Sequence, residues 1–275
     1  MSIQSKINDS IGILKKGEQL ALSLNPNEGY LVSFSGGKDS QVVMKLAEMS
    51  GIRYHAAYSV CGIDSPMNIY FIRENYPDVK FVHPKEKYIQ LLRKKGLPTM
   101  MKRYCCERTK EWLGKGEVVL DGVRAEESRK RAAYAQIQVF SRRKEHRGKE
   151  RGRDENWLAE THHECIKGQD RVIVHPILNW TEEDVWTFIK LYNIPVNPSY
   201  EKFGRVGCMF CPFASRWQIE EYEKMYPGFR KAIIDALYVY WKRTDDHWLS
   251  SPEEYYDWWK SKKTVAKYLA DKQKN

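Results

Sequence analysis

The sequence predicts an α/β fold, in which a Rossmann-like, mostly parallel sheet with helices on both faces is followed by a helical C-terminal region. Short apolar runs with β-branched centres alternate with segments whose apolar residues recur at helical spacing. A glycine-rich turn joins the first of these runs to the next helix, as in the opening of a βαβ unit. Beyond residue 172 the chain carries seven of its nine tryptophans, which favours a helical region packed on the sheet.

Each element is predicted from its local pattern. Residues 1–28 carry apolar side chains spaced for one buried helical face and end in a turn-rich segment at 25–29. Strands are expected at 30–34, 54–60, 80–84, 117–121 and 172–177, and helices at 41–49, 66–75 and 185–191. We predict an N-terminal helix at 1–28, an α/β domain at 29–211 with a polar basic loop at about 141–170, and a helical region at 212–275.

Composition excludes several classes of protein. The 275-residue chain is 42% hydrophobic and 30% charged, which is typical of a globular protein. No apolar stretch approaches the ~18–20 residues that would span a bilayer. The polar start at residues 1–6 lacks the apolar core of a signal peptide. We expect a soluble, cytoplasmic protein without a membrane partner.

The net charge of +10 is concentrated in one tract. Between Arg124 and Arg153 the chain has eleven Lys or Arg residues against four Glu. A local positive field of this kind attracts phosphate, whether on a nucleotide or on a nucleic acid. The alternative is a solvated segment without a partner.

The segment from Val32 to Ser40 is the strongest chemical signal. Its two glycines let backbone N–H groups turn toward an anion, and the following helix adds the positive end of its dipole. Serine hydroxyls and one lysine add further donors, although the spacing is not that of a Walker A loop. The candidate phosphate-binding residues are Ser33, Ser35, Gly36, Gly37, Lys38, Asp39 and Ser40.

The string Ser35-Gly36-Gly37-Lys38-Asp39-Ser40 resembles the PP-loop of the adenine-nucleotide pyrophosphatases. That family includes tRNA thiolation enzymes, amidating synthetases and phosphoadenosine phosphosulfate (PAPS) reductases. Residues 121–131 are similar to the Gly-x-Arg-x-x-x-Ser-x-x-Arg element of the reductase branch, and residues 175–186 are similar to its Trp-x-x-x-Asp-Val-Trp segment. The resemblance runs from about 30 to 211 and adds to the nucleotide site Gly122, Arg124, Ser128 and Arg129. Trp180, Val185 and Trp186 are expected mostly in the core.

Four of the six cysteines form two pairs, Cys105-Cys106 and Cys208-Met209-Phe210-Cys211. Four thiolates suit a [4Fe–4S] cluster or zinc, and buried free thiols are the third reading. Two adjacent cysteines followed far downstream by Cys-x-x-Cys resemble the [4Fe–4S] pattern of the APS-type sulfonucleotide reductases. This resemblance implies that the four cysteines are the cluster ligands.

The other two cysteines are Cys61 and Cys165. Cys61 and Gly62 lie in a segment that resembles the family's Asn-Thr-Gly-x-x-x-Pro-Glu turn, with cysteine in place of threonine. A thiol beside an anion site is a candidate nucleophile or persulfide carrier, and a small core residue is the alternative. Cys165 is expected as an exposed loop thiol, with metal binding beside His162 and His163 as the less favoured reading.

The resemblance implies an enzyme that cleaves ATP to AMP and pyrophosphate, or adenylates an acceptor, in sulfur-transfer chemistry such as nucleic-acid thiolation or phosphorothioation. Lys38, Asp39 and Cys61 are the expected catalytic residues, and Asp39 is a candidate ligand of Mg²⁺. A sulfur donor such as a cysteine desulfurase and a nucleic-acid acceptor held by the basic tract are the expected partners. The reductases also carry a catalytic Glu-Cys-Gly-x-His motif, but the sequence given has no cysteine after Cys211. The alternatives are a reductase of APS or PAPS with a relocated or partner-supplied thiol, and a non-catalytic nucleotide- or nucleic-acid-binding protein.

Overall fold

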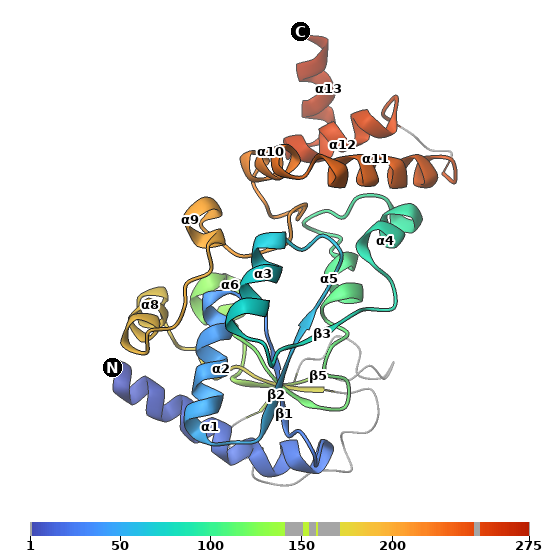
Figure 1. Ribbon diagram of the computed structural model, residues 1–275. Coiled ribbons are helices and arrows are strands. Elements are labelled where there is room, and N and C mark those ends of the chain that lie inside the picture. The colour runs from blue at the N-terminus through green and yellow to red at the C-terminus, as the bar shows by residue number, and fades with distance from the viewer. Residues whose placement is uncertain (1, 141–150, 154–157, 159–170, 245–247, 275) are drawn as a thin grey trace. The chain divides into compact units, whose positions relative to one another are not determined.

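A computed structural model of the chain describes residues 2–140, 151–153, 158, 171–244 and 248–274 (Figure 1). Contacts divide the chain into two compact units that interleave along the sequence. The first unit comprises residues 1–58, 67–82 and 113–206, and the second comprises 59–66, 83–112 and 207–275. These units do not coincide with the consecutive domain boundaries expected from the sequence, which stay a prediction.

The first unit contains the sheet and the helices around it. Its strands are β1 (Tyr30–Ser33), β2 (Tyr54–Ser59), β3 (Lys80–Val82), β4 (Val118–Leu120), β5 (Ile137–Phe140), β6 (Arg151–Arg153) and β7 (Arg171–Val174). Its helices are α1 (Ile3–Leu24), α2 (Lys38–Ser50), α3 (Pro66–Asn75), α6 (Arg129–Ala132), α8 (Glu182–Leu191) and α9 (Ser199–Phe203), with a 3₁₀ turn at Ala125–Glu127.

The strands follow the order β3-β2-β1-β4-β7-β5-β6. Strand β1 pairs in parallel with β2 and β4, and β4 pairs in parallel with β7. Strand β5 runs antiparallel to both β7 and β6. The prediction of a Rossmann-like, mostly parallel sheet is confirmed.

The parallel strands are buried on both faces, as expected for crossover connections that place helices on a sheet. One face carries the apolar cluster of Leu31, Ala57, Val119 and Ile173. On helix α1, the buried residues Ile7, Leu14 and Ala21 recur every seven residues. The hydroxyl of Tyr30 in β1 donates a hydrogen bond to the carbonyl of Leu14 at 2.8 Å, so this helix is tied to the central strand.

Two elements depart from the sequence prediction. Strand β5 was not predicted, although the apolar Ile137 and Val139 alternate with the polar Gln138. Within the expected loop at 141–170, residues 151–153 form strand β6, so part of that prediction was wrong. The physical reason is that β5 offers an edge whose backbone groups need partners. The other residues of that segment, Leu158 excepted, lie outside the described part of the chain, and with them Cys165.

The second unit is helical. It contains α4 (Tyr88–Lys95), α5 (Tyr104–Thr109), α10 (Arg216–Met225), α11 (Pro227–Trp241), α12 (Pro252–Ser261) and α13 (Val265–Gln273). Helix α11 packs against α4, α10 and α12. Rings of Tyr255 and Trp258 stack at 5.7 Å between centroids, and Trp259 is buried. The predicted helical C-terminal region is confirmed.

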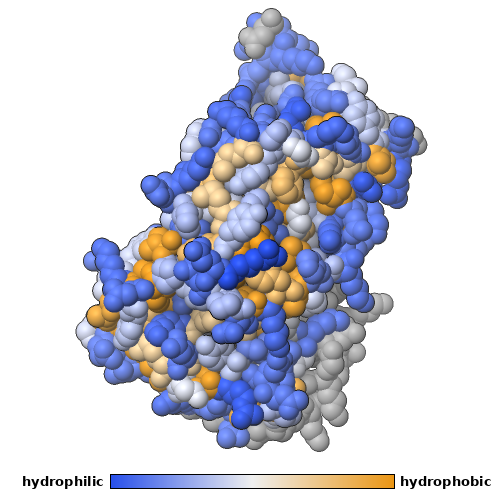
Figure 2. All heavy atoms as spheres, in the orientation of Figure 1, coloured by the Kyte–Doolittle hydropathy of each residue, from blue (hydrophilic) through white to orange (hydrophobic). Residues whose placement is uncertain are grey.

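The face of the molecule in Figure 2 is mainly hydrophilic, with apolar side chains that reach the surface in separate places. None of the helices in the described ranges has both the length and the apolar character that a membrane span requires.

Candidate nucleotide site and cysteine cluster

The loop Ser35–Ser40 connects the carboxyl end of β1 to the start of α2, the usual ligand position in an open α/β sheet. Gly36 has φ 75°, and a Cβ there would lie 2.3 Å from Oδ1 of Asn68, so only glycine fits. Gly37 is the N-cap residue of α2 and supplies no side-chain cap. The positive end of the α2 dipole is therefore left for an anionic ligand.

Ser40 organises the loop from within. Its Oγ donates to the carbonyl of Gly37 at 2.8 Å and accepts from the backbone N–H of Ser35 at 3.1 Å. The two hydroxyls of Ser35 and Ser40 lie 3.0 Å apart. Ser40 is buried, so it shapes the loop, whereas Ser35 lies at its exposed side. Ser33 ends strand β1 and is half-buried.

Two asparagines clamp the loop from outside. Asn68 on α3 donates to the carbonyl of Ser35 at 3.1 Å, and Asn197 donates to the carbonyl of Gly36 at 3.0 Å. Asn197 also donates to Oδ1 of Asn68 at 2.7 Å, and both side chains are buried. Neither residue was predicted. Each is a polar residue among apolar neighbours in the sequence, and the sequence alone does not distinguish such a buried residue from one on the surface.

Charged side chains meet at the loop's helical end. The carboxylate of Asp39 lies between two cations, with Oδ2 3.0 Å from Nζ of Lys38 and Oδ1 2.8 Å from Nε of Arg124. Lys38 is 8% exposed and Arg124 is 2% exposed. Gly122 permits this approach because a Cβ there would lie 2.8 Å from the backbone of Asp39.

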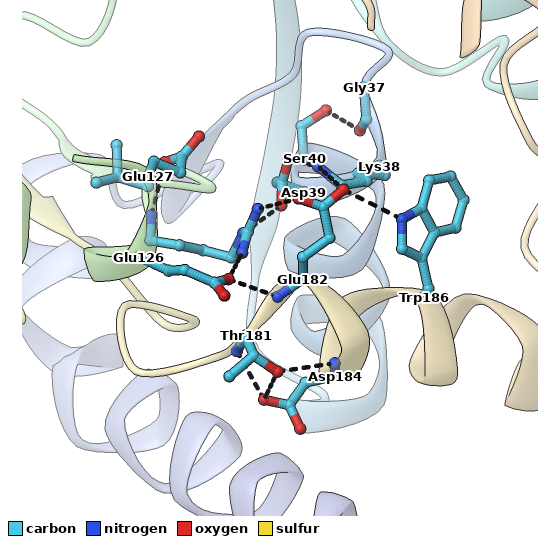
Figure 3. Close-up of polar contacts among 12 residues, drawn as sticks. Gly37, Lys38, Asp39, Ser40, Glu126, Glu127, Thr181, Glu182, Asp184 and Trp186 are labelled. Atoms are coloured by element: carbon cyan, nitrogen blue, oxygen red, sulfur yellow. Dashed lines mark hydrogen bonds and ion pairs between the residues drawn. The ribbon is translucent and has the colours of Figure 1, made fainter. Parts of the chain in front are cut away.

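Two further carboxylates, Glu126 and Glu182, complete the ion-pair network (Figure 3). Glu126 accepts from Nη1 of Arg124 at 2.8 Å and from the backbone N–H of Glu182 at 2.7 Å. Glu182 lies 3.6 Å from Nη2 of Arg124 and 3.9 Å from Nζ of Lys38. Burial lowers the pKa of Arg124, but Asp39, Glu127 and Glu126 together raise it above its usual value. The guanidinium therefore stays charged, and three carboxylates face two cations.

Tyr200, at the start of α9, accepts a hydrogen bond from the backbone N–H of Lys38 at 2.9 Å. Burial raises the pKa of its hydroxyl to about 12, so Tyr200 stays neutral at physiological pH. The ring of Trp186 meets the Tyr200 ring edge-on at 5.4 Å. Trp180 and Val185 are core residues as predicted, but Trp186 is only half-buried, because its indole N–H bonds to Glu182 at 3.4 Å beside the ion pairs.

The remaining predicted residues of this arginine element are more exposed. Ser128 caps helix α6 by accepting from the N–H of Arg131, and Arg129 is exposed. Arg131 pairs with Glu127 rather than with the loop. In the basic tract, Arg142, Arg143, Lys144 and Arg147 lie outside the described residues.

The cysteines of interest belong to the second unit. Cys105 and Cys106 begin helix α5, whereas Cys208 and Cys211 precede α10. The S–H of Cys105 and the Lys110 ammonium lower the pKa of Cys106 to about 7, against the opposing effect of burial. The thiol of Cys61 and the Lys110 ammonium likewise lower the pKa of Cys208 to about 6. Two thiolate-forming cysteines beside one lysine are a donor set that fits a soft metal or an iron–sulfur cluster.

Cys61 and Gly62 also belong to the second unit, whereas the predicted nucleotide-binding loop belongs to the first. The sulfur atoms of Cys61 and Cys208 are 3.6 Å apart. Asp64, which the sequence analysis did not single out, accepts from the Cys61 thiol at 3.0 Å. Gly62 has φ 89°, a value that favours glycine in this turn.

Comparison with known proteins decides the family. Residues 29–214, more than half of the chain, match the family described as the phosphoadenosine phosphosulfate reductase domain. The chain belongs to this family. The match covers the predicted PP-loop, the arginine element and all four paired cysteines, and it confirms the resemblance and the class of PP-loop, PAPS reductase-like enzymes.

Relatives of this PAPS reductase-domain chain include an uncharacterized protein of Methanocaldococcus jannaschii, which is 30% identical in a 239-residue alignment that covers 83% of this chain and 52% of the relative. Sulfate adenylyltransferase subunit 2 of Geotalea daltonii is 28% identical in a 222-residue alignment that covers 70% of this chain and 65% of that protein. The chain thus spans about half to two thirds of the length of these relatives.

Among solved structures, the PAPS reductase of Candida auris in its phosphate complex superposes with a TM-score of 0.44 at 16% identity and covers 73% of this chain and 88% of its own. FMN adenylyltransferase of Candida glabrata, solved with FAD and inorganic pyrophosphate, gives a TM-score of 0.47 at 16% identity over 75% of this chain and 63% of its own. Both are distant similarities.

Proposed function

We propose that this chain binds ATP at the Ser35–Ser40 loop and transfers its adenylyl group to an acceptor with release of pyrophosphate, in sulfur-transfer chemistry. The observation that carries the proposal is the ion-pair network, in which the Asp39 carboxylate bridges the Lys38 ammonium and the Arg124 guanidinium in the first turn of α2. Such a site offers both the cations and the carboxylate that a metal–triphosphate needs.

The loop supplies phosphate contacts of three kinds. The start of α2 presents the positive end of the helix dipole, Ser35 presents a hydroxyl, and Lys38 presents an ammonium. Three carboxylates hold the planar guanidinium of Arg124 in place, so it supplies a fixed positive charge. The Lys38 side chain, in contrast, can move toward a bound ligand. Lys38 is therefore the residue we assign to the reacting phosphates.

Asp39 fits a magnesium ion, because a carboxylate beside phosphate oxygens is the donor that Mg²⁺ prefers. Bound Mg²⁺ would neutralise charge on the phosphates during transfer. When the ligand arrives, its phosphates compete with Asp39 for Lys38, and this exchange frees one carboxylate oxygen. Glu126 and Glu182 keep Arg124 neutralised and in place meanwhile.

The reaction class is supported by the relatives. Sulfate adenylyltransferase subunit 2, named for the transfer of an adenylyl group to sulfate, is among the relatives that align over more than half of this chain. We carry this chemistry over as adenylyl transfer, with the acceptor left as a sulfur-pathway substrate or a nucleic acid approached through the tract 124–153.

We further propose that Cys105, Cys106, Cys208 and Cys211 hold a [4Fe–4S] cluster, as the sequence resemblance implies. Burial and then the nearby Cys105, Cys208 and Cys211 raise the pKa of the Tyr88 hydroxyl, which supports a shared site for these cysteines. A bound cluster would supply iron for sulfur or electron chemistry. A sulfur donor is then the partner that we expect to act at the second unit.

The test uses anaerobically purified protein incubated separately with ATP, APS and PAPS, with magnesium and a thiol reductant. Pyrophosphate and AMP from ATP are the expected products, identified by mass spectrometry together with any adenylylated acceptor. Sulfite from APS or PAPS without pyrophosphate from ATP would refute the proposal.

Reduction of a sulfonucleotide is the second candidate function. It is favoured by the family description and by an adenosine 5'-phosphosulfate reductase of Shouchella clausii, 38% identical over 42 residues, or 15% of this chain and 17% of that protein. The sulfite measurement above tests it directly.

A further inference from the structure

Three side chains of the second unit form a compact donor set, of which the cluster assignment uses only Cys208. The ligand atoms of Cys61, Asp64 and Cys208 all lie within 4.8 Å of one another. Cys61 is 1% exposed and Asp64 is 8% exposed. The Lys110 ammonium acts on the Cys208 thiol, so the carboxylate of Asp64 is not the sole charge beside these sulfurs.

The backbone holds these three side chains in place. Asp64 and Cys208 form an isolated antiparallel bridge, and the N–H of Met209 donates to the carbonyl of Ile63 at 3.0 Å. The carboxylate of Asp64 is fixed by the N–H of Gly62, which donates to Oδ2 at 3.0 Å. The carbonyl of Cys61 accepts from the N–H of Tyr88 at 3.1 Å. The donor set is therefore preorganised by the fold.

The spacing of the sulfurs suits a single ion. Two thiolates on one tetrahedral zinc stand about 3.7 Å apart, since each Zn–S bond is about 2.3 Å. The sulfurs of Cys61 and Cys208 are 3.6 Å apart. Cysteines that bind a cubane each take a separate iron and need wider spacing. The other oxygen of Asp64, Oδ1, faces the Cys61 sulfur at 3.0 Å and completes a Cys₂Asp set.

We propose that Cys61, Asp64 and Cys208 form a mononuclear site for a thiophilic divalent ion, Zn²⁺ or Fe²⁺, in the cluster-free protein. On binding, the ion takes the place of the Cys61 proton that faces Asp64: each of the two sulfurs that still holds a proton loses it to solvent as its sulfur–metal bond forms. Three protein ligands leave a fourth position open to an external ligand. Cys61 is then a metal ligand, an assignment that replaces the nucleophile suggested by the sequence.

The experiment titrates Co²⁺ into chelator-treated, cluster-free protein under anaerobic, reducing conditions and follows the sulfur-to-cobalt charge-transfer absorption. Wild type is compared with Cys61→Ser, Asp64→Asn and the matched control Cys211→Ser. Loss of a direct ligand should weaken binding by more than about tenfold, since outer-shell changes alone cost 10- to 100-fold. We expect that loss in Cys61→Ser and Asp64→Asn, with near wild-type binding in Cys211→Ser.

Circular dichroism checks that each variant is folded. A second measurement needs only the wild type: each cysteine is alkylated with and without Zn²⁺, and peptide mapping shows which ones react. The proposal expects Zn²⁺ to protect Cys61 and Cys208 more than Cys211. Unchanged Co²⁺ binding in Cys61→Ser, equal losses in Cys61→Ser and Cys211→Ser, or no protection of Cys61 would each overturn it. None of these readouts depends on nucleotide turnover, so they are separate from the test of adenylyl transfer.

Discussion

Arg124 carries the electrostatics of the nucleotide site. It is the most buried cation there, and it contacts Asp39, Glu126 and Glu182, which lie on three different segments. A buried guanidinium is retained only if its donors are matched, because an isolated charge in the interior is costly. Lys38, by contrast, has a flexible stem and a single close carboxylate.

The first prediction concerns this residue. Arg124→Ala leaves three carboxylates facing each other and should lower the free energy of unfolding by about 2–4 kcal/mol, less than for a fully buried pair because Glu126 and Glu182 are solvated. Arg124→Lys should recover only part of this loss, since an ammonium cannot satisfy the three carboxylates with a planar fork. Urea unfolding measures both. Equal stability of Arg124→Ala and wild type would show that the ion pairs are not coupled to folding.

The second prediction concerns Tyr200 and pH. Its raised pKa means that the folded state keeps the hydroxyl proton above pH 10, whereas the unfolded chain loses it. The stabilisation is therefore complete below pH 10 and is lost as pH rises from about 10 to about 12. In Tyr200→Phe this contribution is absent, and the Lys38 N–H loses its acceptor at a cost of about 0.5–1.5 kcal/mol.

The measurement is urea unfolding of both proteins at pH 8 and at pH 11. Because other buried tyrosines titrate in both, only the difference between the two proteins reports on Tyr200. We expect that difference to shrink at pH 11. A constant difference would mean that the hydroxyl titrates normally in the folded state.

The strand–loop–helix element around Gly36 shows which parts of the site the sequence can predict. Features that depend on the local backbone could be predicted from the sequence. The apolar run of β1, the glycines and the start of α2 all follow from the local sequence pattern. Asn68 and Asn197 were not, because their role depends on α3 and the segment before α9 meeting at the loop. Asp64 was missed for the same reason, since its partner Cys208 is distant in sequence.

The same distinction explains the errors in the sheet. Strands β1, β4 and β7 are apolar with β-branched residues because they are buried on both sides, so composition alone reveals them. Strands β5 and β6 are short, antiparallel and polar in part, and their identity depends on pairing with β7 and with each other. Pairing of that kind is long-range information.

The third prediction tests the loop element. Gly36→Ala combines a positive φ with a contact of 2.3 Å to Asn68, whereas Gly51→Ala has a similar φ of 72° and no atom within 4 Å. Gly51→Ala should cost about 1 kcal/mol for the backbone alone. Gly36→Ala should cost more in unfolding free energy and should also weaken ATP binding, measured by calorimetry. Equal losses of unfolding free energy at the two positions would show that Asn68 moves away from the new Cβ without a penalty.

The fourth prediction tests the clamp itself. Asn197→Ala removes three hydrogen bonds and leaves the Gly36 carbonyl and Oδ1 of Asn68 short of donors and the Ser199 N–H short of an acceptor, at a cost of about 1–3 kcal/mol. Asn75→Ala is the matched control, because Asn75 is exposed and bonds only within its own helix. We expect weaker ATP binding in the first variant and unchanged binding in the second. Identical ATP affinities of the two variants would show that the Asn197 hydrogen bonds do not contribute to ATP binding.

At the scale of the whole molecule, the two proposed ligand sites belong to different compact units. The phosphate loop, the ion pairs and both clamping asparagines lie in the first unit, whereas Cys61, Asp64 and the paired cysteines lie in the second. The units interleave in sequence, so neither is a continuous segment that could be excised. Their ligands should therefore stabilise two different sets of residues in one intact chain.

The last prediction follows from this division. A ligand that binds only the folded state stabilises it by about 2.7 kcal/mol at one hundred times its Kd. Magnesium-ATP should then slow amide hydrogen exchange mainly at residues 30–50, 118–128 and 182–200, and Zn²⁺ should slow it mainly at residues 59–66, 104–112 and 207–214. Lys38→Ala should remove the first protection pattern and keep the second, and Cys61→Ser should do the reverse. Protection by a ligand spreads beyond the residues that it contacts only where the two regions open cooperatively. If ATP protected the cysteine segments of the cluster-free protein as strongly as the loop, the two sites would therefore be energetically coupled, and the prediction of two separate patterns would be wrong.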